Sequence, residues 1–149
     1  MKNIVTILSF LLISIILIPQ AQAQIFSIPS RQMVERLLGE IEECKEQLVD
    51  LEAELVDIKN NPGNYTYQDY LLTREIIQTG KDCVAFNRKK LDNLRKNYPE
   101  WFTDPQATID LGRGHSVTPK QLKKKVKDNE RFFADLLARF NAIPVPERD

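Results

Sequence analysis

The residues best suited to chemistry are a lone histidine and its neighbours, Gly112-Arg113-Gly114-His115-Ser116. A histidine can act as a general acid or base near neutral pH, and an adjacent arginine can hold an anion. Glu100, Asp104 and Asp110 lie close by in the sequence, so a catalytic set can be drawn there. The Gly-x-Gly spacing follows no predicted strand and therefore lacks the context of a dinucleotide-binding loop. We expect the chain not to be an enzyme, with catalysis around His115 as the alternative.

Cys44 and Cys83 are the second candidate for chemistry, and the chain has no other cysteine. We expect them to form a structural disulfide, because the chain carries an export signal and oxidising compartments favour bridged pairs. One alternative is two reduced, buried cysteines that pack as small apolar side chains. The other is a redox-active pair, although such pairs are usually close together in the sequence.

Composition excludes several classes of function. A single His and two Cys leave little material for a metal site, so we expect neither a metal nor a cofactor. The 21 basic residues are balanced by 21 acidic ones. A nucleic-acid-binding protein would carry a clear basic excess, so we expect no nucleic-acid partner.

Two further groups are candidates for contact with a partner. The run Lys123-Lys124-Lys125-Val126-Lys127 suits an anionic partner, although a solvated helix face is the alternative interpretation. Tyr98-Pro99-Glu100-Trp101-Phe102 concentrates aromatic side chains, which either anchor a partner or fold down to cap the helices. The candidate partner-binding residues are Trp101, Phe102, Arg113, His115, Lys120, Lys123 and Lys124.

The N-terminus is typical of a secretory signal peptide. A nearly unbroken apolar run, Ile4 to Ile18, follows Lys2, and Ala21-Gln22-Ala23 matches a signal-peptidase site. We predict a signal peptide over residues 1–23 and one helical domain over residues 24–149. The protein should then be periplasmic or secreted. Asn64-Tyr65-Thr66 fits the glycosylation sequon, which applies in a eukaryotic source.

The first helix is predicted over about 30–60, with Ser30 as its N-cap. Its apolar positions recur at alternating three- and four-residue spacing, which indicates a helix packed lengthwise on another helix. Pro62 and Gly63 follow its end. The apolar positions are Val34, Leu37, Ile41, Cys44, Leu48, Leu51, Leu55 and Ile58.

The second helix is predicted over about 66–97, with Thr66 as N-cap and Asp69 completing a capping box. It shows two apolar stripes, so it should be contacted on two sides. If the first two helices form an antiparallel hairpin, Cys44 faces Cys83 in the first stripe. That stripe contains Leu72, Ile76, Thr79, Cys83 and Phe86, and the second contains Ile77, Val84, Leu91, Leu94 and Tyr98.

The connection 98–117 is predicted to be irregular, with no strand and with a short helix near 105–111. That short helix rests on Asp104-Pro105 as an N-cap signal and Gly112 as a stop. The third helix, about 118–141, begins with a clear capping box, Thr118-Pro119-Lys120-Gln121.

These elements predict an all-α fold, a long antiparallel helical hairpin plus a third helix, as a three-helix bundle or coiled-coil-like assembly. The first helix has nine acidic and four basic residues, whereas the third has seven basic and three acidic, which favours docking within the chain.

We expect an exported protein that acts through protein–protein interaction, as an envelope adaptor, chaperone-like factor or accessory subunit with an unknown protein partner. The alternative is a module that binds anionic lipid or cell-wall polymer through the basic third helix. Exposed helix faces also permit a homo-oligomer.

Overall fold

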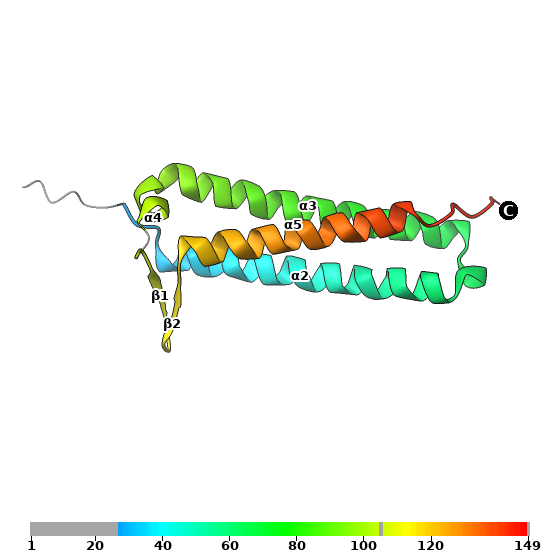
Figure 1. The fold of residues 1–149 in the computed structure, drawn as a ribbon, viewed down its shortest axis with the longest axis horizontal. Helices are drawn as coiled ribbons and strands as arrows, with labels where there is room; N and C mark the ends of the chain where they lie inside the picture. The colour runs from blue at the N-terminus through cyan, green and yellow to red at the C-terminus, as the bar shows by residue number, and fades with distance from the viewer. Residues whose placement is uncertain (1–26, 105, 149) are drawn as a thin grey trace, which may run out of the picture.

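The computed structural model describes residues 27–104 and 106–148, and most of them are helical. Three long helices lie side by side, and each contacts the other two (Figure 1). This confirms the prediction of a mainly helical chain. The elements are α2 (Arg31–Asn60), η1 (Pro62–Asn64), α3 (Tyr67–Asn97), α4 (Pro99–Thr103), β1 (Ile109–Gly112), β2 (His115–Val117) and α5 (Pro119–Asn141).

Two features relate to export and membranes. The predicted signal peptide, residues 1–23, lies outside the described residues. Among the helices of the described part, none combines the length and the apolar character needed to cross a bilayer.

Side-chain caps start each long helix where the sequence indicates. Ser30 accepts a hydrogen bond from the backbone N–H of Met33 at the start of α2. Thr66 with Asp69, and Thr118 with Gln121, form complete capping boxes at the starts of α3 and α5. In each box the hydroxyl and the N3 side chain satisfy backbone donors that a helix leaves unpaired.

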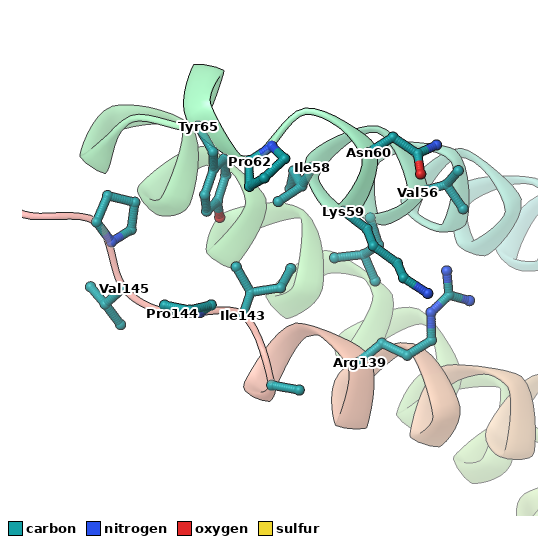
Figure 2. A pocket seen from close by; sticks show the side chains of 13 residues that line it. Val56, Ile58, Lys59, Asn60, Pro62, Tyr65, Arg139, Ile143, Pro144 and Val145 are labelled. Carbon is teal, nitrogen blue, oxygen red and sulfur yellow. The ribbon is translucent and has the colours of Figure 1, made fainter.

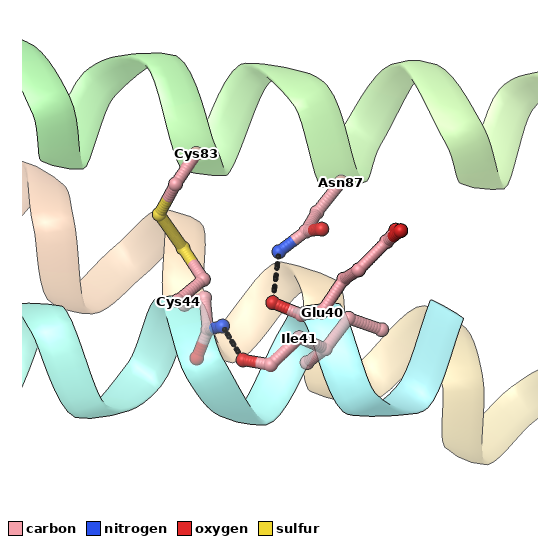
Figure 3. Close-up of a disulfide and its surroundings, with 6 residues drawn as sticks. Glu40, Ile41, Cys44, Cys83 and Asn87 are labelled. Atoms are coloured by element: carbon pink, nitrogen blue, oxygen red, sulfur yellow. Dashed lines mark hydrogen bonds between the residues drawn. A yellow bond between two sulfur atoms is a disulfide. The ribbon is translucent and has the colours of Figure 1, made fainter. Parts of the chain in front are cut away.

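The helix α2 buries all eight apolar positions of its predicted seam. Two buried asparagines interrupt the core beside it (Figure 3). Asn87 of α3 donates to the carbonyl oxygen of Glu40 at 3.3 Å, and Asn129 of α5 donates to that of Ile41 at 2.9 Å. A buried amide is stable only where its partner is in reach, so these bonds favour one register of the three helices.

The predicted disulfide is present and joins α2 to α3 next to this polar layer (Figure 3). The Cα atoms of Cys44 and Cys83 are 5.8 Å apart, within the normal range for a bridge. The apolar core divides near this level into two clusters, one around Ile41 and Leu122 and the other around Leu48 and Leu136.

The assignment of the core face of α3 was wrong. Leu72, Ile76 and Phe86 are 59%, 41% and 50% exposed, so they do not form a seam with α2. The true seam repeats at the same three- and four-residue spacing one position further along the chain. It contains Thr73, Ile77, Gly80, Val84, Asn87, Leu91 and Leu94. Its apolar members are those of the second predicted stripe, whereas Thr73, Gly80 and Asn87 were not predicted to belong to it.

Acidic residues of α2 form ion pairs with basic residues of α3 and α5. Lys90 of α3 and Lys125 of α5 pair with Glu40 and Glu42 of α2. Lys125 holds the pKa of Glu42 below its usual value through their hydrogen bond. Such exposed pairs each contribute little to stability, so their main effect is on the orientation of the helices.

The short helix predicted near 105–111 was also wrong, as was the absence of strands. Asp104 ends α4 instead of starting a helix, and its carboxylate accepts from the backbone N–H of Gln106. Ile109 and Val117 pair across an antiparallel hairpin. Arg113 and Gly114 between the strands have φ values of 54° and 76°, as a type I′ turn requires at both central positions.

Candidate functional site

The predicted partner-binding residues gather at one end of the molecule, with α4, the β-hairpin and the start of α5 (Figure 1). We call this the hairpin end. Their exposure differs greatly. Trp101 is only 2% exposed and belongs to the core cluster that contains Leu122, so its ring closes this end of the core. The capping alternative therefore describes Trp101, and its side chain offers no contact surface.

Phe102 lies between the core and the solvent. Its ring packs edge-on against Trp101, with centroids 5.0 Å apart, and is half-buried. The ammonium group of Lys123 lies 5.1 Å from the Phe102 centroid, within the range of a cation–π contact. Phe102 and Lys123 therefore form a mixed apolar and basic patch at the hairpin end.

The hairpin itself projects away from the helices (Figure 1). Ile109 and Val117 anchor it in the core, and Arg113 and His115 are exposed near its tip. Asp110 accepts a hydrogen bond from the backbone N–H of Gly112 at 2.7 Å and so stabilises the turn. Among the hydrogen bonds of the described residues, none joins His115 to a carboxylate. The catalytic set drawn from the sequence therefore has no geometric support.

The basic residues of α5 form an exposed row. Lys120, Lys124, Lys127 and Arg131 recur at four- and three-residue spacing, which places them on one face of the helix. Lys124 pairs with Asp128 at 2.6 Å, a contact within the same helix. The row is thus an extended basic strip, whereas the neighbouring Lys123 and Lys125 point elsewhere, toward Phe102 and Glu42.

A second surface runs along α3, and the sequence pattern found its residues but assigned them to the core. Leu72, Ile76, Thr79, Cys83 and Phe86 lie on one face, which we call the apolar stripe. Cys83 is bonded to Cys44, and the Phe86 ring lies 4.4 Å from the ammonium group of Lys90. Lys90 also pairs with Glu40, so the stripe runs along the side of α3 that adjoins α2.

Carboxylates border the apolar stripe on both sides. On α3, Glu75 and Asp82 lie one position before Ile76 and Cys83 and are exposed. On α2, four acidic residues follow Glu40 at helical spacing and so lie on the same face of α2. The side chain of Glu40 reaches α3 from this face. We call these four residues the acidic row: Glu43, Asp50, Glu54 and Asp57.

A pocket of about 810 Å³ lies at the opposite end, between the end of α2, η1 and the C-terminal tail (Figure 2). Most of its lining is aliphatic, and the polar side chains are Lys59, Asn60 and Arg139 together with the Tyr65 hydroxyl. No sequence signal predicted this pocket, because it forms between two segments far apart in the chain, 55–65 and 139–146.

Across 27–104 and 106–148, no group of three His, Cys, Asp or Glu side chains could hold a metal ion. Comparisons with protein-family models, curated proteins and solved structures found no match.

Proposed function

We propose that this chain is an exported protein that acts by binding a helical segment of a protein partner along the apolar stripe of α3. The observation that carries the proposal is an exposed stripe with the heptad spacing of a helix–helix seam. Leu72, Ile76 and Phe86 keep 59%, 41% and 50% of their surface in solvent. Burying the exposed part of such side chains contributes on the order of 1 kcal/mol each, so a helix that covers the stripe gains useful affinity.

The borders of the stripe define the partner's chemistry. Carboxylates from α3 and from the acidic row of α2 favour an amphipathic helix that carries apolar residues at heptad spacing and lysine or arginine beside them. A second copy of this chain is a poorer fit, because pairing two stripes brings acidic borders together. The partner class is therefore a basic amphipathic helix.

The experiment compares a double variant of the stripe with a single control variant, each replacing exposed aliphatic residues by serine. Leu72→Ser with Ile76→Ser removes apolar contact from exposed positions, whereas Val49→Ser changes an exposed valine on α2. Val49 lies one heptad from Glu42, which pairs with α5, so it is away from the stripe. The probe is a synthetic helix with leucine at heptad positions and lysine at its flanks, and its binding is measured by fluorescence anisotropy.

We expect the stripe variant to bind the peptide about tenfold more weakly, which corresponds to about 1.4 kcal/mol, with Val49→Ser unchanged. A peptide with glutamate flanks should bind more weakly than the lysine peptide. Equal binding by the stripe variant and the native chain would refute the proposal. So would equal affinity for the two peptides.

The fold also supports the finer arrangement that we propose, a three-helix bundle built on an antiparallel α2–α3 hairpin. Contacts between α2 and α3 join Glu40 to Lys90 and Cys44 to Cys83, so residue numbers rise along one helix as they fall along the other. Zero-length carbodiimide crosslinking should join Lys90 to Glu40, between α3 and α2, and Lys125 to Glu42, between α5 and α2. Crosslinks that pair the two ends of the molecule would contradict this arrangement.

Export is the part of the proposal that concerns compartment. Residues 1–23 supply the signal pattern, and the Cys44–Cys83 bridge is of the kind that oxidising compartments favour. The intact mass of the native protein tests it. A mature chain that begins at Gln24 is expected, and a chain that retains Leu11 and Leu12 would overturn it.

A second candidate function is attachment to an anionic envelope surface. Its support is the exposed basic strip of α5, whose first residue, Lys120, closely follows the β-hairpin that carries Arg113 and His115. Binding of this kind weakens steeply above physiological salt, whereas docking on the apolar stripe keeps its apolar contribution and weakens less. Lys120→Gln with Lys127→Gln should weaken attachment to anionic vesicles by on the order of tenfold, and equal attachment by this variant and the native chain would refute this function.

A further inference from the structure

We propose that the pocket at the end opposite the hairpin binds a small amphiphilic carboxylate, an aliphatic chain with one carboxylate head. This inference is independent of the α3 stripe. The pocket volume of about 810 Å³ lies within the range of small-molecule sites, about 300–1,000 Å³. Aliphatic walls accept the chain, and two cations at the rim accept the head.

The apolar walls of the pocket come from two segments that are far apart in the sequence and meet at this end of the molecule. Ile58 of α2 and Pro62 of η1 form one wall, and Ile143, Pro144 and Val145 of the C-terminal tail face them (Figure 2). Proline has no backbone N–H, so the tail offers few donors that would need water. The walls therefore suit an aliphatic chain better than a polar ligand.

The tail is held in position beyond the pocket. The Arg148 guanidinium donates to the Tyr67 hydroxyl at 2.7 Å and lies 4.8 Å from the centre of its ring. Tyr67 begins α3, so this contact ties the end of the tail back to the start of the second helix. The wall formed by Ile143–Val145 is thus fixed at both its ends.

The polar rim favours a negative charge. Lys59 and Arg139 extend toward one another from α2 and α5 (Figure 2). Arg139 contacts Glu52 at 3.1 Å and Asp135 at 3.7 Å through one nitrogen, Nη1, so further N–H groups of its guanidinium stay available. Among the described residues that line the pocket, none carries a carboxylate. An anionic head at this rim therefore meets the ammonium group of Lys59 and the N–H groups of Arg139 that Glu52 and Asp135 leave available.

The aromatic wall is compatible with this ligand. Burial raises the pKa of the Tyr65 hydroxyl, so Tyr65 stays neutral at physiological pH and adds no negative charge. Its oxygen is enclosed within the protein. Tyr65 thus presents its ring to the pocket.

Calorimetric titration with three matched probes tests the inference: decanoate, decan-1-ol and decyltrimethylammonium. We expect decanoate to bind about tenfold more tightly than the alcohol, a difference of about 1.4 kcal/mol, and the cation to bind least. Lys59→Gln should weaken decanoate binding about tenfold and leave the alcohol unchanged. The matched control is Lys81→Gln, an exposed lysine on α3 that does not line the pocket.

Two results would overturn the proposal. One is the absence of decanoate binding at millimolar concentration. The other is equal loss in Lys59→Gln and Lys81→Gln, which would show a general charge effect and not a built site. Because Lys59 is exposed, its substitution leaves the core intact and the comparison interpretable.

Discussion

Two glycines in long helices provide a direct test of how closely α3 packs. Gly39 in α2 is exposed, and a Cβ atom added there would meet nothing within 4 Å. Gly80 in α3 is buried, and its added Cβ would lie 3.2 Å from the Leu48 Cδ2 atom and 3.2 Å from the Phe133 Cε2 atom. Carbon atoms prefer separations of about 3.5–4.0 Å, so Leu48 and Phe133 would have to move.

The substitutions Gly39→Ala and Gly80→Ala have the same effect on the backbone entropy of the unfolded chain but different effects on packing in the folded state. Alanine raises the free energy of unfolding by about 1 kcal/mol in either helix, because it restricts the unfolded chain. At Gly80, overpacking of a filled core costs about 1–3 kcal/mol. Gly39→Ala should therefore stabilise by about 1 kcal/mol, whereas Gly80→Ala should be neutral or destabilise by up to about 2 kcal/mol.

Urea and thermal unfolding of both variants, with the disulfide intact, measure the difference. A change of 1 kcal/mol corresponds to about 4 °C in Tm for a domain of this size, so the two effects are resolvable. Because the backbone contribution is the same in both variants, the difference between their free energies of unfolding measures the cost of packing the added methyl group at Gly80. Equal stabilisation by both substitutions would refute the close approach of α3 to Leu48 and Phe133.

Three further predictions follow from the core, the bridge and one ion pair. Trp101→Ala should lower the free energy of unfolding by about 3–5 kcal/mol in urea, and a surface role for the ring would instead leave stability unchanged. Replacing both Cys44 and Cys83 by alanine should cost about 2–4 kcal/mol, and non-reducing peptide mapping of the native chain should show that pair linked. The lowered pKa of Glu42 means that its pair with Lys125 stabilises the fold at neutral pH, and this stabilisation is lost as the pH falls through that pKa. Glu42→Gln should therefore reduce the dependence of the unfolding free energy on pH in the acid range. An unchanged dependence would contradict the pairing.

The comparison of α2 with α3 shows where sequence reasoning works and where it fails. Every seam position of α2 is apolar, so periodicity identified the buried face without ambiguity. In α3, Thr73, Gly80 and Asn87 occupy the seam, each for a reason visible only in three dimensions. Gly80 admits close approach and Asn87 bonds to α2, so the neighbouring apolar stripe appeared to be the better core face.

The candidate sites show the same division. Caps and the cysteine pair depend on local signals and a shared register, and the sequence located both. The β-hairpin has only four- and three-residue strands, too short for an alternation pattern, although Arg113-Gly114 is a turn signal that could have been weighed. The pocket has no local signal, because the tail is placed there by contacts distant in the sequence, those of Ile143 with the core and of Arg148 with Tyr67.

The position of the disulfide has a consequence for the chain after proteolysis. The bridge spans 39 residues, and the exposed turn at Pro62–Asn64 lies inside that span. A single cut in this turn would leave the two fragments joined covalently, with all three long helices still attached to one another. The nicked molecule would run as one species until a reductant separated it into two, so the covalent link between α2 and α3 does not depend on this turn.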